Sequence, residues 1–273
     1  MKTRAKSGIG IRGLTIYGIL YLVFLYVPVL FLPLFSFNDS IHISFPLKGF
    51  TVKWYEHMFA NAELLDAFVN SLKVAGSVSV ISTVLGVMAA RAFTRYRFRG
   101  QRPALGLLAL PLVVPGIILG IALLIMSKWA GFQLSLITIA AAHVLIATPF
   151  ATFVMISRLE GFDPNLEEAS RDLGESGWTT FWRVTFPLAL PGIVASLLLT
   201  FIESFDEFIL AFFLSGDEAT MPLYIWSQLR FPRNLPVVLA LGACILAASI
   251  ILVAFAEWVR RQGVSPTPKS ENQ

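Results

Sequence analysis

The sequence contains little of the chemistry that enzymes use. Cysteine occurs once, as Cys244 inside an apolar run, which excludes an internal disulfide framework, a CxxC motif and a cysteine metal site. His42, His57 and His143 are scattered without metal-ligand or catalytic-triad spacing, and we expect His143 to be a packed or hydrogen-bonded helix residue. HExxH and GxSxG motifs are also missing. We therefore predict no catalytic residue and no metal site in this chain.

A nucleotide-binding loop is missing as well. Hydrolysis of ATP within the chain would need a phosphate-cradling GxxxxGK[ST] loop, and no Gly-Lys pair occurs anywhere in the sequence. We expect no cofactor in this chain, so any ATP that drives the protein must be bound by another polypeptide.

Charge is scarce, and hydrophobic residues dominate the composition. Only 14% of the 273 residues are charged and 56% are hydrophobic, with a mean hydropathy of +0.73. A soluble domain of this size could neither expose nor bury so much apolar surface. The net charge is +4, but the basic residues mostly flank apolar stretches, which is typical of membrane orientation signals. We predict an integral membrane protein that contacts lipid and binds no nucleic acid.

Six apolar segments are long enough to cross a bilayer, which takes about 20 residues in a helix. The six are residues 14–35, 68–90, 104–126, 134–156, 188–214 and 236–259. The first is too long for the core of a signal peptide and lacks a small-x-small cleavage site, so we interpret it as an uncleaved span. The sequence therefore predicts an all-α membrane protein with six transmembrane helices.

The basic residues also predict the orientation of the chain. The connection between the second and third segments is rich in arginine, and two more arginines follow the last segment: Arg91, Arg95, Arg97, Arg99, Arg102, Arg260 and Arg261. The turn between the third and fourth segments holds only Lys128. The positive-inside rule then places both termini in the cytoplasm. We expect a cytoplasmic segment at 1–13, a six-span domain at 14–259 with a cytoplasmic loop at about 158–187, and a cytoplasmic tail at 260–273.

The same topology places residues 36–67 and 215–235 outside the membrane. The first of these segments carries apolar and aromatic side chains that suggest an amphipathic stretch on the membrane surface: Trp54, Tyr55, Met58, Phe59, Leu64 and Leu65. Such a stretch either packs over the spans or meets an external partner, and the sequence leaves both interpretations open.

The loop at 158–187 carries strong helix signals. Asp163 is a good N-cap with Pro164 at the first helical position, Glu167 and Glu168 suit the positive end of the helix dipole, and Gly174 can end the helix. The predicted result is a short capped helix.

One face of this helix is apolar, and a second helix is expected to follow it. Leu166, Ala169 and Leu173 recur at helical spacing with a small residue in the middle. Ser176 is the expected N-cap of a second helix that Pro187 stops. That second helix carries Trp178, Phe181, Trp182 and Val184. We predict a compact cytoplasmic helical hairpin.

The residues of this loop resemble a known signature. The matching residues are Glu168, Ala169, Gly174, Val184, Phe186 and Pro187. They resemble the EAA motif of binding-protein-dependent ABC importer permeases, which reads Glu-Ala-Ala, three residues, Gly, nine residues, Ile-x-Leu-Pro. Ser170, Val184 and Phe186 depart from the pattern but keep small size or apolarity. A hairpin stabilised only by its own stripe is the alternative interpretation.

The resemblance implies a type I ABC importer permease-like fold in a bacterial inner membrane. In that family the first loop helix is a coupling helix that sits in a cleft of the ATPase. It implies ATPase-coupling roles for Leu166, Glu167, Glu168, Ala169, Leu173 and Gly174. It further implies that the chain is a transport subunit rather than an enzyme. The expected partners are two ATPase subunits that bind ATP and Mg, a second homologous permease subunit, and an external solute-binding protein.

A weaker resemblance concerns the substrate. Residues 51–55, 204–208 and 221–230 are similar to the spermidine/putrescine-type permease subfamily. Within the fifth apolar segment, Glu203, Asp206 and Glu207 have i, i+3 and i+4 spacing and should share a helix face. Either these acids attract a cationic substrate such as a polyamine, or they pair with basic groups or accept backbone hydrogen bonds.

The sequence thus favours a permease subunit that forms the path for a small solute, with a polyamine as the expected substrate. An importer of another small solute, such as an aminophosphonate, is one alternative. A secondary transporter driven by an ion gradient is another, with Asp206 and Glu207 as coupling sites, although such proteins often contain internal repeats and none is convincing here. A homodimer and a heterodimer both remain open.

Overall fold

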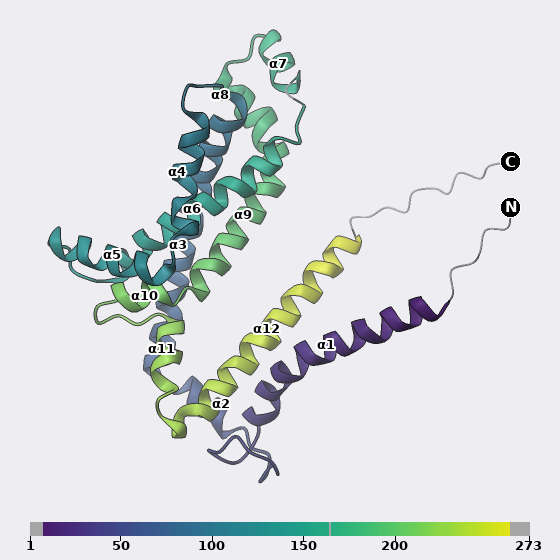
Figure 1. Cartoon of the computed structure of the whole chain (residues 1–273), viewed down its shortest axis with the longest axis vertical. Coiled ribbons are helices and arrows are strands. Elements are labelled where there is room, and N and C mark those ends of the chain that lie inside the picture. The colour runs from purple at the N-terminus through teal and green to yellow at the C-terminus, as the bar shows by residue number, and fades with distance from the viewer. Residues whose placement is uncertain (1–7, 164, 263–273) are drawn as a thin grey trace. The chain divides into compact units, whose positions relative to one another are not determined.

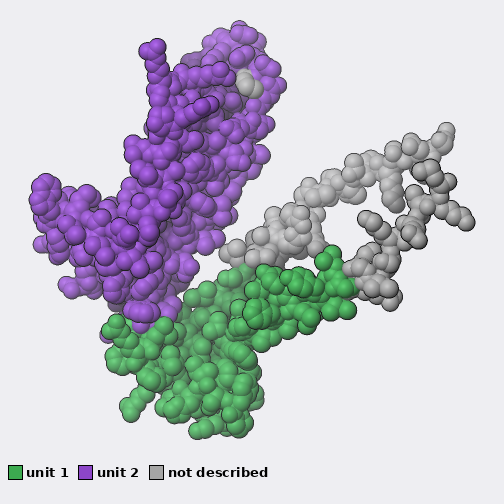
Figure 2. Space-filling view, in the orientation of Figure 1, with its two compact units in different colours: residues 1–61, 227–273 green, residues 62–226 purple. Residues whose placement is uncertain are grey.

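The computed structural model describes residues 8–163 and 165–262. Within these ranges the chain is helical, and its one β pairing is an isolated bridge between Asn38 and Phe50 (Figure 1). The chain divides into two compact units (Figure 2). Unit 1 contains residues 1–61 and 227–273, and unit 2 contains residues 62–226.

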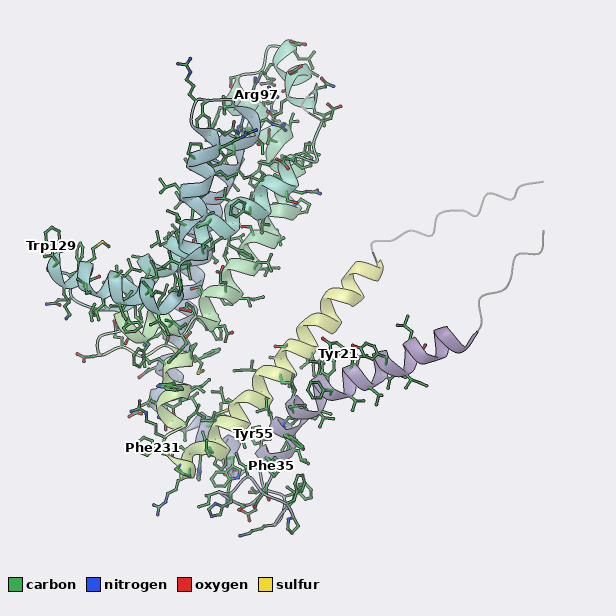
Figure 3. The ribbon with its side chains drawn as sticks, in the orientation of Figure 1. Tyr21, Phe35, Tyr55, Arg97, Trp129 and Phe231 are labelled. Atoms are coloured by element: carbon green, nitrogen blue, oxygen red, sulfur yellow. The ribbon has the colours of Figure 1, made fainter. Side chains whose placement is uncertain are left out.

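Unit 1 is built on the packing of the first and last helices. Helix α1 (Gly8–Ser36) lies against α12 (Leu235–Gln262), and the short helix α2 (Lys53–Phe59) also packs on α12. A 3-10 turn at Pro232–Asn234 leads into α12. Helix α1 is apolar around its whole circumference, and only 6% of its most apolar stretch is buried. Tyr21, labelled in Figure 3, is 53% exposed, as expected of a helix whose surroundings are apolar.

Helix α2 falls within the stretch predicted to be amphipathic, and one of its faces is buried. Trp54 and Met58 are buried, while Phe59 on the same helix is 66% exposed. The indole Nε1 of Trp54 donates to the carbonyl of Asn38 at 2.8 Å, and Tyr55 shares a 2.6 Å hydrogen bond with Ser36. One face of α2 is therefore held against the end of α1, which is the packing interpretation of this segment.

Unit 2 is a bundle around three long helices. Helices α3 (Ala62–Arg95), α6 (Leu136–Leu159) and α9 (Phe186–Asp206) pack against one another. The remaining helices are α4 (Gln101–Val113), α5 (Gly116–Trp129), α7 (Asn165–Asp172), α8 (Gly177–Thr180), the π-helical segment η1 (Phe181–Thr185), α10 (Ile209–Leu214) and α11 (Met221–Gln228).

Small side chains allow the three long helices to approach closely, as is common in membrane bundles. A Cβ atom on Gly86 would lie 2.7 Å from the Cβ of Ala151, so α3 and α6 touch through a residue that has no side chain. Nearby, Thr83 and Ser196 share a buried 3.1 Å hydrogen bond that joins α3 to α9. The bundle is therefore tied together by close backbone contact and polar pairing.

The all-α expectation with six apolar segments is confirmed. Five helices are long and apolar enough to cross a membrane, and a bent pair forms the sixth segment. The five are Gly13–Ser36, Ala62–Arg95, Leu136–Leu159, Gly177–Asp206 and Pro232–Ile251.

The third segment is not the single straight helix that the sequence suggested. Helices α4 and α5 meet at 98°. Val114 and Pro115 are both extended, with ψ of 129° and 130°. At Val114 this follows because a proline disfavours helical geometry in the residue before it. Helix α5 then packs on α10, and Gly120 leaves room for the ring of Phe213.

The fifth segment is also interrupted. Helix α9 ends at Asp206, Glu207 is extended, and α10 begins at Ile209. A carboxylate oxygen of Glu207 accepts a 2.8 Å hydrogen bond from the backbone N–H of Leu210. This bond satisfies one of the donors that a helix start leaves unpaired, and it stabilises the break.

Candidate functional site: a capped surface helix and an intramembrane polar cluster

Helix α7 begins and ends where the sequence predicted. The Asp163 carboxylate accepts a 3.0 Å hydrogen bond from the N–H of Asn165, which confirms the predicted N-cap; Pro164 lies outside the described residues. At the other end Gly174 has a φ of +89°, and its N–H donates to the carbonyl of Arg171 at 2.9 Å. Glycine adopts this left-handed geometry without steric cost, so it terminates the helix.

Glu167 anchors α7 to the body of unit 2. This residue is 6% exposed. Its Oε1 accepts hydrogen bonds from Thr185 Oγ1 at 2.9 Å and from Arg95 Nε at 3.2 Å. Arg171 Nη2 lies 3.9 Å from the other carboxylate oxygen. A buried charge needs such partners to offset its lost hydration, and these contacts fix α7 against α3 and η1.

The sequence analysis placed Glu167 among the coupling residues because the resemblance to the EAA family implies that role for the first helix of the loop. The structure directs its side chain inward, towards a partner 72 residues earlier in the chain. A single sequence holds no signal that pairs these two residues.

The opposite face of α7 points outward and is apolar. Leu166 is 48% exposed and Leu173 is 86% exposed, and Glu168, Ala169 and Gly174 are exposed as well. We call these five residues the α7 surface. The predicted stripe therefore does not pack against the rest of unit 2. Two solvent-exposed leucines beside a small residue are typical of a surface that another protein covers.

The connection from α7 to α8 is short and well bonded. Ser176 accepts a 3.2 Å hydrogen bond from the N–H of Thr179, which confirms the predicted cap of the second helix. Ser170 shares a 3.1 Å hydrogen bond with Thr180. Ser170 stands where the EAA pattern has alanine, and its hydroxyl joins the two arms of the hairpin.

The second helix does not stop at Pro187, contrary to the sequence analysis. Helix α8, η1 and α9 form one continuous helix, Gly177–Asp206. The N–H of Phe186 donates to the carbonyl of Phe181, five residues back, so the helix widens into a π turn just before the proline. Pro187 is the second residue of α9 and has no N–H to donate to the preceding turn, so the widened π turn lies where a regular helical hydrogen bond is missing.

Inside the bundle, α6 and α9 share a buried polar cluster. His143 is 1% exposed, and its Nδ1 forms a 2.8 Å hydrogen bond with Ser204 Oγ. This confirms the expected packed, hydrogen-bonded histidine. Among the described residues, His143 Nε2 and Glu203 Oε2 are buried atoms without a hydrogen-bond partner. Because an unpaired buried polar group is costly, such atoms mark a place for water or a ligand.

The three acids of the fifth segment differ in their local structure. Glu203 is half-buried within α9 and Asp206 is exposed at its end. Glu207 lies beyond the helix and caps α10, so it does not continue the shared face. Neither Glu203 nor Asp206 forms an ion pair with a described residue. Glu207 thus matches the structural interpretation, and the other two acids remain available to a cation.

The bundle, its outward α7 surface and its buried polar cluster define a helical membrane transport subunit. The chain belongs to the family of binding-protein-dependent transport system inner membrane components, whose model matches residues 82–262. It is a permease subunit of a bacterial ATP-binding-cassette importer and a multi-pass protein of the inner membrane. The secondary-transporter alternative is therefore dropped.

Curated relatives match most of the chain. The spermidine/putrescine transport system permease protein PotC of Haemophilus influenzae is 34% identical over 241 residues, which cover 88% of this chain and 93% of PotC. PotC of Escherichia coli K12 is also 34% identical, over 87% of this chain and 90% of its own length. The putrescine transport system permease protein PotI of the same strain is 33% identical over 86% of this chain and 85% of PotI.

Solved structures share the fold. A chain of a bacterial ABC transporter involved in the import of the acidic polysaccharide alginate aligns with a TM-score of 0.71 at 18% identity, covering 96% of this chain and all of that one. A chain of the MetNI methionine ABC transporter aligns with a TM-score of 0.60 at 18% identity, covering 74% of this chain and 96% of that one. These matches support the type I importer permease fold that the loop motif implied.

Proposed function

We propose that this chain forms part of the translocation path for a polyamine such as spermidine or putrescine. The observation that carries the proposal is the 34% identity to spermidine/putrescine permeases over 88% of the chain. The acids at the end of α9 support it, because a polyamine stripped of water needs anions for its ammonium groups. Asp206 is exposed and Glu203 has a buried oxygen without a partner among the described residues. We assign substrate contact to these two acids.

We also propose that the α7 surface binds a separate ATPase subunit, which holds the ATP and Mg. The complete importer contains two such ATPase subunits, a second homologous permease and an external solute-binding protein. Movement of α7 reaches the spans through Glu167, because this residue bonds both Arg95 on α3 and Thr185 at the start of the long helix. ATP-driven closure of the ATPase pair then moves the spans between inward-open and outward-open states.

The cytoplasmic placement of α7 and of both termini is part of the same proposal. Contact between Arg95 and Glu167 puts α7 at the same end of unit 2 as the arginine-rich turn after α3. Figure 3 labels Arg97 at the end of the unit where Figure 1, in the same orientation, labels α7. The positive-inside rule assigns such a turn to the cytoplasm.

The experiment that tests this function uses the full chain purified with its co-expressed partner subunits and reconstituted in liposomes. We expect ATP hydrolysis to rise, and labelled spermidine to accumulate, when binding protein loaded with spermidine is present. An aminophosphonate serves as the competing substrate. Stimulation by the aminophosphonate instead of the polyamine would retain the importer and overturn the substrate.

Leu173→Asp tests the coupling role separately. Since Leu173 is 86% exposed, the change should leave folding intact while removing apolar contact with the ATPase. We expect the ATPase subunit to stop co-purifying and transport to be lost. Asp172→Asn, at the neighbouring exposed position, is the matched control and should retain both. Normal co-purification of Leu173→Asp would contradict the assignment.

A further inference from the structure

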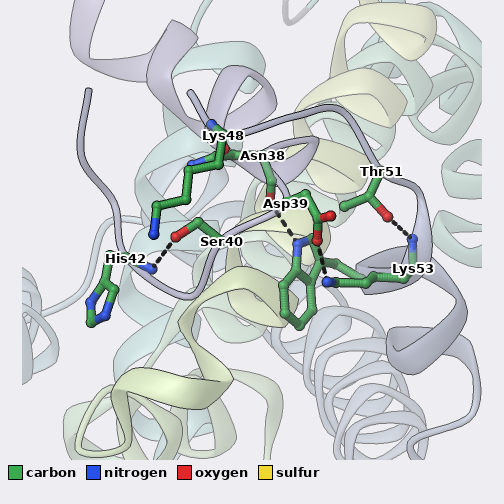
Figure 4. A network of polar contacts seen from close by, with 8 residues as sticks. Asn38, Asp39, Ser40, His42, Lys48, Thr51 and Lys53 are labelled. Atoms are coloured by element: carbon green, nitrogen blue, oxygen red, sulfur yellow. Dashed lines mark hydrogen bonds and ion pairs between the residues drawn. The ribbon is translucent and has the colours of Figure 1, made fainter. Parts of the chain in front are cut away.

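The loop between α1 and α2 in unit 1 has a well-ordered polar base. The side-chain oxygen of Asn38 accepts a 3.0 Å hydrogen bond from the backbone N–H of Lys48. The backbone carbonyl of Asn38 accepts a hydrogen bond from the indole N–H of Trp54. Asp39 pairs with Lys53 across the same base (Figure 4). These contacts join the two ends of the loop and hold them beside α2.

The tip of this loop, residues 41–46, has the opposite character. Its sequence is Ile-His-Ile-Ser-Phe-Pro, which contains no carboxylate and no amine. The large side chains are exposed: Ile41 by 38%, Ile43 by 48% and Phe45 by 64%. Every charged residue of the loop lies in the base. An apolar tip on a charged base is the distribution expected of a loop whose tip is buried in an apolar environment while its base stays in water.

Aromatic contacts show the direction in which the tip folds. The ring of Phe45 packs edge-on against Phe35, with centroids 5.1 Å apart, and against Phe31 at 6.3 Å. Phe31 precedes the end of α1 at Ser36 by five residues, which is roughly 7 Å along a helix. The tip therefore turns back along α1 and lies beside its membrane-spanning part.

The surface that the tip joins is an exposed apolar part of α1. Phe31 is 42% exposed, and Phe24, further along the same helix, is 76% exposed. The exposed faces of Phe45 and Phe31 thus form one continuous apolar surface. Aromatic side chains are favoured at this level of a bilayer, where the hydrocarbon meets the headgroups.

We propose that residues 41–46 insert into the lipid leaflet at the C-terminal end of α1, with Ile43 and Phe45 at the edge of the acyl chains. The tip acts as an anchor that sets the depth of α1. Through Asn38 and Trp54 it also holds α2 at the membrane surface. This role depends on neither the substrate nor the ATPase, and it holds for either orientation of the chain.

The single cysteine makes the test direct. In a Cys244→Ser background, a spin label is attached at Ile43→Cys or Phe45→Cys in the full chain, reconstituted with its partner subunits in phosphatidylethanolamine and phosphatidylglycerol liposomes. Collision rates with oxygen, which concentrates in lipid, and with a water-soluble nickel chelate are measured. Phe24→Cys provides the lipid reference, and Lys48→Cys in the loop base provides the water reference.

We expect the oxygen-to-nickel ratio at positions 43 and 45 to exceed that at 48 several-fold and to remain below that at 24, which lies about 18 Å further along α1. A ratio at 43 and 45 equal to that at 48 would place the tip in water and overturn the proposal. Shielding from both reagents would overturn it as well, because it would show that a protein covers the tip. Ile43 makes none of the ring contacts that position Phe45, so its label reports even if Phe45→Cys disturbs the fold.

Discussion

Two regions of unit 2 hold buried glutamates, and they treat them in opposite ways. At the α7 end, the Oε1 atom of Glu167 is bonded to both Arg95 and Thr185. Inside the membrane, Glu203 keeps one buried oxygen without a partner among the described residues. A fully paired carboxylate holds helices in place, whereas an unpaired one is free to bind something that arrives. The same residue type thus serves as an anchor in one region and as a candidate ligand-binding group in the other.

Removing the anchor should have the largest effect. Glu167→Ala leaves Arg95 without its partner in a site where the arginine side chain is only 16% exposed. Breaking a buried pair from one side costs about 3–5 kcal/mol. We expect a large fall in the midpoint of thermal unfolding, together with loss of ATPase co-purification.

Glu167→Gln is the matched control, because an amide still accepts a hydrogen bond from Thr185. The stability of Glu167→Gln should lie between that of Glu167→Ala and that of the unmodified chain. Equal stability of Glu167→Ala and the unmodified chain would show that the contacts at this end carry no energy.

Crowding the bundle between the two regions should have the next largest effect. Gly86→Ala places a Cβ 2.7 Å from Ala151 and 2.9 Å from the backbone of that residue. Overpacking of this kind costs about 1–3 kcal/mol. Gly76→Ala on the same helix is the control, since a Cβ there meets nothing within 4 Å.

Thermal unfolding in detergent measures both glycine variants. We expect a lower midpoint for Gly86→Ala only. If the two variants behave alike, α3 and α6 do not meet as closely as described.

The candidate ligand-binding group should affect transport more than stability. Glu203→Gln keeps the shape of the side chain and removes the negative charge. We expect initial spermidine uptake at low concentration to fall about tenfold, equivalent to ~1.4 kcal/mol, with assembly unchanged. Glu207→Gln retains an oxygen that can accept the hydrogen bond from the N–H of Leu210. Spermidine uptake should therefore fall less in this variant than in Glu203→Gln. The reverse order of the two variants would assign the substrate contact to Glu207.

The smallest effect is expected at the hairpin. Ser170→Ala restores the alanine of the EAA pattern but removes the 3.1 Å bond to Thr180. A partly buried neutral hydrogen bond contributes about 1 kcal/mol. Hydrogen exchange at the α7 amides should become modestly faster, while the outward α7 surface still binds the ATPase. Unchanged exchange would show that the anchor at Glu167 alone holds the hairpin.

Local signals explain which features the sequence could predict. The caps at Asp163, Ser176 and Gly174 depend on residues within four positions of the helix end, so the printed sequence contains everything that forms them. Apolar length likewise located the six spans, since crossing a bilayer requires it. The loop motif behind the proposed coupling role is likewise a fixed spacing of residues that are close in the sequence.

The features that sequence reasoning missed depend on distant neighbours. The inward role of Glu167 requires Arg95, 72 residues away. Proline positions were visible, yet Pro28, Pro33 and Pro149 lie within helices that continue, whereas Pro115 accompanies a 98° bend. Neighbouring helices decide between these outcomes, because they can supply hydrogen-bond partners to the backbone groups that a proline leaves unpaired. A single sequence does not show those neighbours.

The uninterrupted helix Gly177–Asp206 has a mechanical consequence. Its 30 residues span roughly 45 Å, from the hairpin beside α7 to the acids near its far end. A continuous helix of this length can carry a movement at one end to the other. The π turn at Phe181–Thr185 is a place where this helix departs from regular α-helical hydrogen bonding. Bending should therefore concentrate there, so the π turn would act as a hinge near the driven end of a lever.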